Sequence, residues 1–163
     1  HSDGVISPNM PKWIRRLGNV VVPGQPKQTR KIFLTRKDAE NRNIINQQQL
    51  LLALKGWEQI TLENLTLTEQ VQIFKEASHI LSPHGAGLVN TLWCQPGTKV
   101  IELQHKKFIG KKVYPILSQH LGLEHKVYLA KSKPINKAKP KNKKSKDMVD
   151  LEINIPELLK YLD

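Results

Sequence analysis

The 163-residue sequence contains a single cysteine, few aromatic side chains and no long apolar run. A lone cysteine, Cys94, cannot form a disulfide within the chain, which is typical of a reducing compartment and favours a buried, inert thiol. The longest apolar run is Leu50–Leu54, far short of the roughly 18 residues that a membrane-spanning helix needs. No signal peptide is recognisable at the N-terminus, and we expect a cytoplasmic protein.

Acidic residues are also scarce, because 14 Asp and Glu stand against 26 Lys and Arg, for a net charge of +12. Residues 131–146 hold eight lysines and no acid, so the remainder carries +12 less 8, or +4. Interleaved Pro, Asn and Ser are typical of a solvated loop. The alternative is contact with an anionic membrane surface or with nucleic acid. No aromatic residue interleaves with the lysines, so we expect no nucleic-acid partner and keep the membrane surface as the alternative.

Short apolar runs that predict strands alternate along the chain with segments whose apolar spacing predicts helices. This alternation predicts an α/β fold with a doubly wound, mostly parallel, Rossmann-like sheet. We interpret residues 1–30 as a connector or the remnant of a preceding domain, and residues 31–163 as one domain. The predicted strands are 31–36, 57–62, 78–83, 99–103, 126–129 and 148–153, and the predicted helices are 11–17, 43–55, one capped by Thr66 and Glu69, 111–121 and 156–162.

The stretch from Ser78 to Asn90 has the outline of a strand, a tight turn and a helix N-terminus. Such a junction binds phosphate, because backbone N–H groups are free there and the helix dipole favours an anion. Gly85 and Gly87 flank Ala86 in the turn, and glycine lets a backbone approach a ligand closely. Ligands of parallel sheets sit at the carboxyl ends of the strands, where this turn is expected.

Five polar residues at or near these strand ends are candidates for ligand contact. Arg36 and Arg42 suit bidentate phosphate binding, although each could equally be a surface arginine. His84 could donate to a phosphate or sugar oxygen or be a structural turn residue, and Asn90 could bind ligand or backbone. Glu102 could accept both ribose hydroxyls, its alternative being a solvated acid at the end of a strand.

The segment Gly85–Asn90 nearly matches the dinucleotide fingerprint G-x-G-x-x-G, with Asn in place of the third glycine. An NAD-dependent oxidoreductase is therefore one alternative function. The six histidines lack the spacing of metal ligands and there is no cysteine cluster, so we predict no metal site.

Several motifs occur together in a characteristic order over about residues 30–104. They are Leu34-Thr35-Arg36, then Arg42 and Asn46, then Glu69-Gln70, then the segment 84–90, and finally Pro96-Gly97 with the strand that ends in Glu102-Leu103. This order resembles glycosyltransferase family 61, which groups capsular-polysaccharide enzymes, plant xylosyl- and arabinosyltransferases and secretory O-linked GlcNAc transferases. Thr35 replaces the usual Ser of the family, and Gln47 stands where Glu is usual.

The resemblance implies the C-terminal, donor-binding half of a GT-B glycosyltransferase, whose N-terminal acceptor domain is absent from this chain. Such an enzyme transfers a sugar from a nucleoside diphosphate sugar, here a UDP-sugar, to a glycan acceptor in polysaccharide biosynthesis. The implied reaction proceeds with inversion and requires no cofactor or metal. The alternatives are a non-catalytic module, which binds a nucleotide or binds an anionic surface through 131–146, and the oxidoreductase. The implied donor-binding residues, with His84 as the catalytic candidate, are Arg36, Arg42, His84, Gly85, Ala86, Gly87, Asn90 and Glu102.

Overall fold

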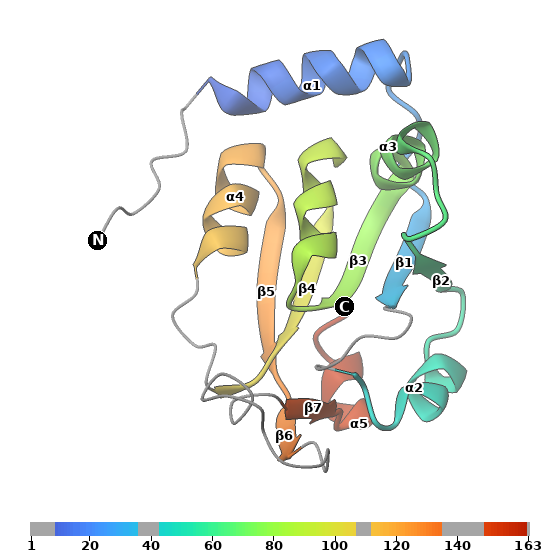
Figure 1. Ribbon diagram of the computed structural model, residues 1–163, viewed down its shortest axis with the longest axis vertical. Coiled ribbons are helices and arrows are strands. Elements are labelled where there is room, and N and C mark those ends of the chain that lie inside the picture. The colour runs from blue at the N-terminus through green and yellow to red at the C-terminus, as the bar shows by residue number, and fades with distance from the viewer. Residues whose placement is uncertain (1–8, 36–42, 107–111, 135–148, 163) are drawn as a thin grey trace, which may run out of the picture.

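A computed structural model describes residues 9–35, 43–106, 112–134 and 149–162. Its centre is a five-stranded parallel sheet in the order β2-β1-β3-β4-β5, and a two-stranded antiparallel sheet, β6-β7, lies beside it (Figure 1). The predicted α/β fold with a parallel sheet is therefore confirmed. The strands are β1 (Arg30–Thr35), β2 (Glu58–Thr61), β3 (Ala77–Pro83), β4 (Lys99–Gln104), β5 (Glu124–Leu129), β6 (Lys131–Pro134) and β7 (Val149–Glu152). The helices are α1 (Met10–Val21), α2 (Gln47–Ala53), α3 (Leu67–Glu76), the 3-10 helix η1 (Ala86–Trp93), α4 (Val113–Leu121) and α5 (Ile155–Leu159).

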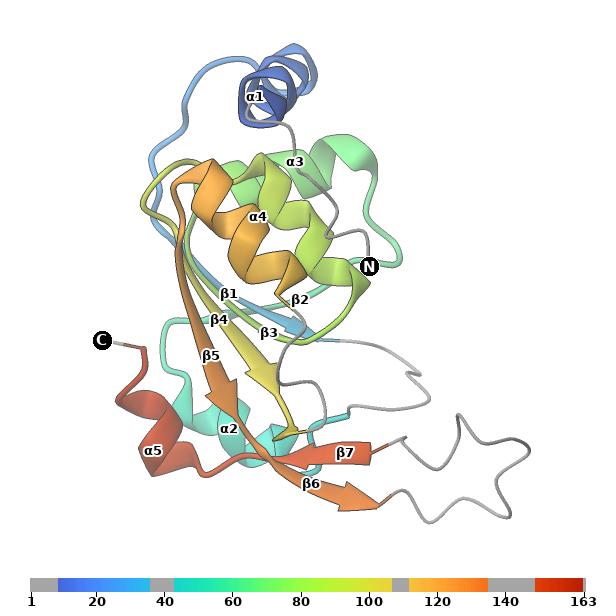
Figure 2. The same ribbon diagram turned by 90° about the vertical axis from the view of Figure 1, so that its left-hand side faces the viewer.

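Helices cover both faces of the parallel sheet, as in a doubly wound fold (Figure 2). Successive side chains of a strand point to opposite faces, so Ile32 and Leu34 of β1 join one core and Phe33 joins the other. The first core lies under α3, η1 and α4, and includes Phe74 and Leu88. The second contains side chains of α2 and α5, as well as residues of β7. Because both faces are buried at β1, β3 and β4, these strands contain apolar runs, and this is why the sequence predicted them.

The chain reverses its direction across the sheet next to β1. It places β2 on one side of β1 and then returns to place β3 on the other side. The carboxyl ends of all five strands lie at the same edge of the sheet, since every pairing is parallel. In such sheets the ligand crevice lies at this edge, where the strand order reverses.

The predicted capping box of α3 is confirmed. The Glu69 N–H donates to Thr66 Oγ1 at 3.3 Å, and the Thr66 N–H donates to Glu69 Oε2 at 2.7 Å. The two groups satisfy each other at the end of the helix, where backbone N–H groups otherwise lack partners.

Helix α1 is longer than the predicted segment 11–17, and it packs against the helical layer. Arg15 donates to the Leu121 carbonyl at 2.7 Å. Gly18 lies so close to the Trp93 ring that an added Cβ would be 3.4 Å from its Cε3 atom. Within residues 1–30, which we interpreted as a connector, α1 thus makes contacts to α4 and η1.

Two predicted segments differ from the structure because long-range pairing overrides local pattern, and a third is helical as predicted but of a different helix type. The helix expected over 43–55 begins only at Gln47, since Ile44 forms a parallel bridge with Leu151 of β7. The lysine run 131–146 was expected to be a loop, but Lys131–Pro134 form β6 against β7. The segment after Gly85 is a 3-10 helix rather than an α-helix. The rest of the run, 135–146, lies outside the described residues.

Two expectations about single features can be compared with the described part of the chain. Cys94 is buried and burial raises the pKa of its thiol, so the expectation of an inert cysteine is confirmed. Among the residues that the structure covers, none of the helices has the length and apolar character needed to cross a membrane.

Candidate functional site

The loop that joins β3 to η1 lies at the carboxyl edge of the sheet, next to the point where the strand order reverses. The His84 N–H donates to the Leu103 carbonyl at 2.9 Å, which extends the β3–β4 pairing by one residue. Gly85 has an extended backbone that any residue can adopt. Gly87 packs closely on its neighbour instead, because a Cβ there would be 3.3 Å from Leu62 Cδ1, which would have to shift slightly. The backbone at Gly85 thus does not require glycine, whereas the close packing at Gly87 favours it. Ala86 between them is exposed.

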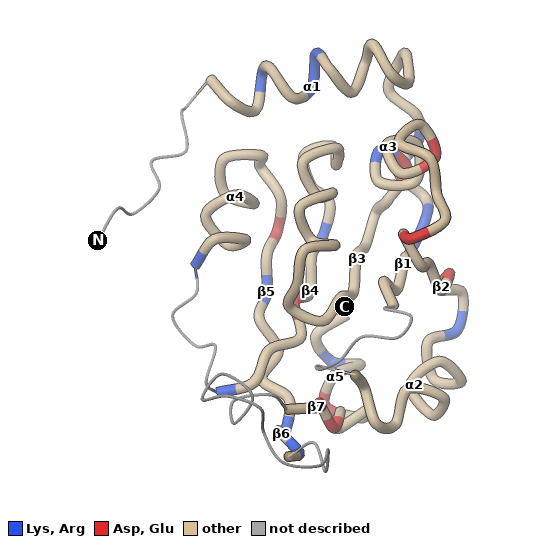
Figure 3. The backbone as a smooth tube through the Cα atoms, viewed as in Figure 1, with Lys and Arg blue, Asp and Glu red and all other residues tan. Residues whose placement is uncertain are grey.

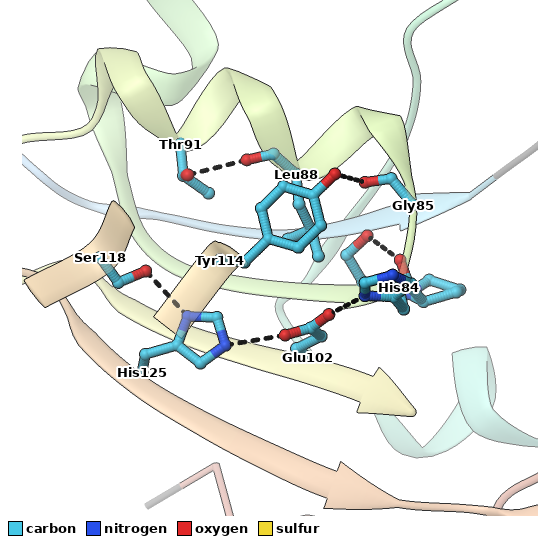
Figure 4. A network of polar contacts seen from close by, with 10 residues as sticks. His84, Gly85, Leu88, Thr91, Glu102, Tyr114, Ser118 and His125 are labelled. Carbon is cyan, nitrogen blue, oxygen red and sulfur yellow. Dashed lines mark hydrogen bonds and ion pairs between the residues drawn. The ribbon is translucent and has the colours of Figure 1, made fainter. Parts of the chain in front are cut away.

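His84 is the outer member of a buried polar network (Figure 4). Its Nδ1 atom hydrogen-bonds Glu102 Oε1 of β4. The other carboxylate oxygen, Oε2, lies 3.0 Å from His125 Nε2 of β5, and His125 Nδ1 lies 2.8 Å from Ser118 Oγ of α4. We call these four residues, His84, Glu102, His125 and Ser118, the Glu102 network. The loop after β3 and strand β5 thus both contact one carboxylate of β4, and α4 is linked to it through His125.

The Glu102 carboxylate is ionised although its side chain has no exposed surface. Burial alone would raise the pKa of Glu102, but hydrogen bonds from His125, His84 and Gln104 outweigh burial and lower this pKa to about 2. His84, by contrast, keeps 11% of its side-chain surface exposed. The network therefore connects a buried negative charge to one histidine at the surface of the loop.

Tyr114, in the first turn of α4, holds the same loop from the other side. Its hydroxyl donates to the Gly85 carbonyl at 2.7 Å. Its ring contacts the His84 ring edge to face, with centroids 5.4 Å apart. The imidazole of His84 is thus oriented by a carboxylate on one side and packed by an aromatic ring on another.

The structure brings together five of the eight residues that the sequence indicated. His84, Gly85, Ala86 and Gly87 form the loop, and Glu102 contacts His84 directly. Asn90 lies further along η1, where its Oδ1 accepts from Trp93 Nε1 at 3.3 Å. Arg36 and Arg42 lie outside the described residues.

The expected position of Glu102 is wrong in one respect. It was interpreted as a strand-end acid, in contact with a ribose or with solvent, but β4 continues to Gln104 and the carboxylate is fully buried. Its oxygens are engaged by two histidines, which sequence reasoning could not foresee. In this arrangement Glu102 hydrogen-bonds His84 and orients its imidazole ring.

Sequence reasoning missed His125, Ser118 and Tyr114. His125 lies in a strand that also holds Glu124 and Lys126, so its polarity alone did not single it out. The pairing of β4 with β5 decides which residue lies beside Glu102, and this register is not visible in the sequence. Within the described ranges, no group of three or more His, Cys, Asp or Glu side chains is placed to hold a metal ion.

Comparison with known proteins identifies the family. The family model described as Glycosyltransferase 61 matches residues 2–101, which is more than half of the chain. The chain belongs to glycosyltransferase family 61. The resemblance seen in the order of the sequence motifs is thereby confirmed.

Curated relatives of this family 61 chain carry one name, protein O-linked-mannose beta-1,4-N-acetylglucosaminyltransferase 2. The human protein is 41% identical over 69 residues, which are 39% of this chain and 12% of the human protein. The Tetraodon nigroviridis protein is 37% identical over 70 residues, which are 40% of this chain and 12% of that protein. The dog protein, from Canis lupus familiaris, is 38% identical over 69 residues, which are 39% of this chain and 12% of the dog protein. The matched stretch thus spans about an eighth of each relative's length.

The position of the glycine loop also bears on the oxidoreductase alternative. In dinucleotide-binding folds the G-x-G-x-x-G turn follows the first strand of the sheet. Here the partial match follows β3 and leads into a 3-10 helix. Together with the family match, this placement argues against the NAD-dependent alternative.

Proposed function

We propose that this domain is the donor-binding half of a GT-B glycosyltransferase, which transfers a sugar from a UDP-sugar to a glycan acceptor with inversion. The observation that carries the proposal is His84, held by a buried carboxylate on the loop at the carboxyl edge of the sheet. The place is where a doubly wound sheet binds its ligand. The family membership supports sugar transfer as the reaction class.

His84 is the residue that meets the diphosphate of the donor in this proposal. Its Nδ1 atom hydrogen-bonds Glu102, and the proposal assigns the ligand contact to Nε2. An imidazole protonated on both nitrogens donates from Nε2 to a phosphate oxygen while Nδ1 donates to the carboxylate. This arrangement stabilises the negative charge that develops on the leaving diphosphate as the sugar is transferred.

Arg36 and Arg42 complete the proposed diphosphate site, as their guanidinium groups suit bidentate phosphate contact. Arg36 directly follows Thr35, the last residue of β1, in the sequence. Cationic side chains and His84 would perform the charge stabilisation that a metal ion performs in other enzymes. We accordingly propose a reaction without an essential metal.

The choice of substrates to test comes from the relatives. Their name specifies an N-acetylglucosaminyl group and O-linked mannose. We therefore propose UDP-GlcNAc as the first donor to test and an O-mannosyl glycan as the first acceptor. In a GT-B enzyme the acceptor is bound by a second domain facing the donor domain, so donor binding is the direct test for this chain.

The test is isothermal titration of the chain with UDP, UDP-GlcNAc, GDP and NAD, with magnesium or with EDTA, supported by thermal shift. Ligand at about 100 times its dissociation constant should stabilise the protein by roughly 2.7 kcal/mol. We expect binding of UDP and UDP-GlcNAc that is independent of magnesium. His84→Ala should weaken it at least about tenfold, because a hydrogen bond to a charged group is lost.

The matched control is His120→Ala, which removes an exposed histidine at the far end of α4. It should leave nucleotide affinity unchanged. Binding of NAD alone, or equal UDP affinity in His84→Ala and the wild type, would contradict the proposed site. Binding only with magnesium would contradict the metal-independent reaction.

A further inference from the structure

Helix α1 carries an apolar stripe that the packing of the domain leaves exposed. Trp13, Leu17 and Val20 follow one another at spacings of four and three residues, so they lie on the same side of the helix. Their exposed fractions are 65%, 54% and 79%. The side of α1 that docks on the domain holds Pro11 and Gly18, which are buried. We call Trp13, Leu17 and Val20 the α1 stripe.

Positive charge lies along one edge of the α1 stripe. Lys12 and Arg16 are exposed and four residues apart, so they form a second row on the helix, next to the stripe. Helix α1 contains no acidic residue, and Figure 3 shows cations and no acid on it. Arg15 instead donates to the Leu121 carbonyl of the domain at 2.7 Å. The outer side of α1 thus combines apolar side chains with cations.

We propose that the α1 stripe is a membrane-surface contact, in which α1 lies flat in the interface of a bilayer that contains anionic lipid. Helices that bind in this way have Trp and Leu on one side and Lys and Arg beside them, and they need no long apolar run. The Trp ring prefers the headgroup level, where its apolar part is buried and its N–H is hydrated. Lys and Arg bury their stems and keep their charge at the phosphates.

The position of α1 suits such a contact. Figure 1 shows α1 across the end of the sheet where the strands begin, whereas the candidate site is at the carboxyl edge. A membrane bound to α1 would therefore not cover the loop that follows β3. Strand β6, the described start of the lysine run, lies at the opposite end of the molecule from α1 (Figure 1). The α1 contact is thus separate from any contact of the lysine run, and it does not depend on the proposed donor site.

A second copy of the chain fits the outer side of α1 less well. In a symmetric dimer the same surface meets itself, so Lys12 and Arg16 would lie close to the same two cations of the other copy, with no acid of α1 to balance them. A stable dimer interface also takes about 20–30 residues on each side, whereas the stripe offers three apolar side chains. An anionic lipid surface complements the charge and can take up a single helix.

The first experiment measures sedimentation of the full chain with vesicles of phosphatidylcholine, with and without phosphatidylserine. We expect binding to the vesicles that contain phosphatidylserine. Leu17→Gln should weaken this binding about 5- to 10-fold, because less apolar area enters the bilayer. Leu52→Gln, the same change at an exposed position of α2, is the matched control and should leave the affinity unchanged. Both positions are exposed, so folding should be unaffected.

A pair of double variants tests the cations. Lys12→Gln with Arg16→Gln should weaken binding to the anionic vesicles about 10- to 30-fold at about 0.1 M salt. Lys55→Gln with Lys160→Gln removes the same net charge from exposed positions near α2 and α5. Screening over about 10 Å should keep the effect of this second pair below about twofold. Equal losses in the two pairs would show that net charge alone governs binding and would overturn the proposal.

Trp13 tests whether α1 is the inserted element. Vesicles whose lipids carry bromine in their acyl chains should quench part of the tryptophan emission of the full chain, and Trp13→Phe should remove this quenching. Binding without quenching, or quenching that persists in Trp13→Phe, would place another surface on the membrane and overturn the proposal. Absence of binding to the anionic vesicles would also overturn it. A lipid-free dimer that Leu17→Gln dissociates, measured by sedimentation velocity, would identify a second copy as the occupant instead.

Discussion

At the scale of single residues, the unusual feature is a carboxylate with no exposed surface in the middle of a parallel strand. Glu102 pairs in register with Ser82 of β3, and it faces the helices η1 and α4 rather than solvent. Isolated buried charges are costly, and proteins keep them only with good hydrogen-bond partners. The two histidines are these partners, so the same contacts serve both stability and the proposed donor site.

Glu102 should make the stability of the protein depend on acid pH. Its pKa falls from the ordinary 4.5 to about 2 on folding, so its contribution is complete above about pH 4.5 and is lost as the pH falls toward about 2. With about 1.4 kcal/mol per pH unit, the contribution is of the order of 3 kcal/mol. Urea unfolding at pH 7 and pH 3 should show that Glu102→Gln loses this pH dependence. Glu124→Gln, at an exposed position of β5, is the control. An unchanged pH dependence in Glu102→Gln would contradict the assignment.

At the scale of elements, helix α1 is attached to the domain through a buried lysine of α3. Lys75 is 5% exposed, and its Nζ donates to Asn19 Oδ1 at 2.8 Å and to the carbonyls of Val22 and Gly24 at 2.6 Å. These three acceptors use all three donors of the ammonium group. Burial lowers the pKa of Lys75. Lys75 thus binds the last turn of α1 and the two carbonyl groups of the segment that follows this helix.

Replacing Lys75 should loosen this attachment. Lys75→Met keeps an unbranched side chain, one atom shorter, but leaves three oxygen acceptors without their donor, so we expect a loss of about 1–3 kcal/mol. Hydrogen exchange should show faster exchange in α1, while the amides of β3 and β4 change less. Lys55→Met, at an exposed position, should have no measurable effect. Equal protection of α1 in Lys75→Met and the wild type would show that Lys75 does not hold the helix.

Elements could be predicted from the sequence where a local signal decides them. The apolar runs of β1, β3 and β4 and the capping residues Thr66 and Glu69 are such signals, and these elements are confirmed. The structure of residues 43–46 could not be predicted in this way, because it depends on β7, more than a hundred residues away. There the Asn46 side chain donates to the Ile153 carbonyl and accepts from the Ile153 N–H, at 2.8 and 3.0 Å. The loop His84–Gly87 was visible as a motif, whereas His125 needed the register of β5.

At the scale of the whole molecule, the positive charge is unevenly placed. Figure 3 shows lysines on β6 and acidic residues on β7, and Lys133 Nζ lies 3.3 Å from Glu152 Oε2. The pairing of Pro134 with Val149 brings the two ends of segment 135–148 next to each other. A short turn can therefore replace this segment without separating β6 from β7.

Replacing residues 135–148 by Asn-Gly, a pair that suits a tight hairpin turn, should leave the fold intact. Six lysines would be removed, and we expect weaker binding to vesicles that contain anionic lipid. Vesicle binding of the wild type should decrease as salt is raised from about 0.05 to 0.5 M. UDP affinity should be the same in both proteins. If vesicle binding is absent in the wild type or equal in the two proteins, the lysine run has no membrane role.

The contact between α1 and η1 also gives the protein an optical probe of its own. The indole of Trp93 in η1 is half-buried next to Gly18 of α1. Trp13, which is also on α1, is 65% exposed and already lies mostly in solvent. With the third tryptophan removed as Trp57→Phe, emission from Trp93 should move to longer wavelength when α1 leaves it, and Trp13 should add little to that change. Because Trp93 ends the helix that begins beside His84, its fluorescence can follow both the docking of α1 and events at the loop without any added label.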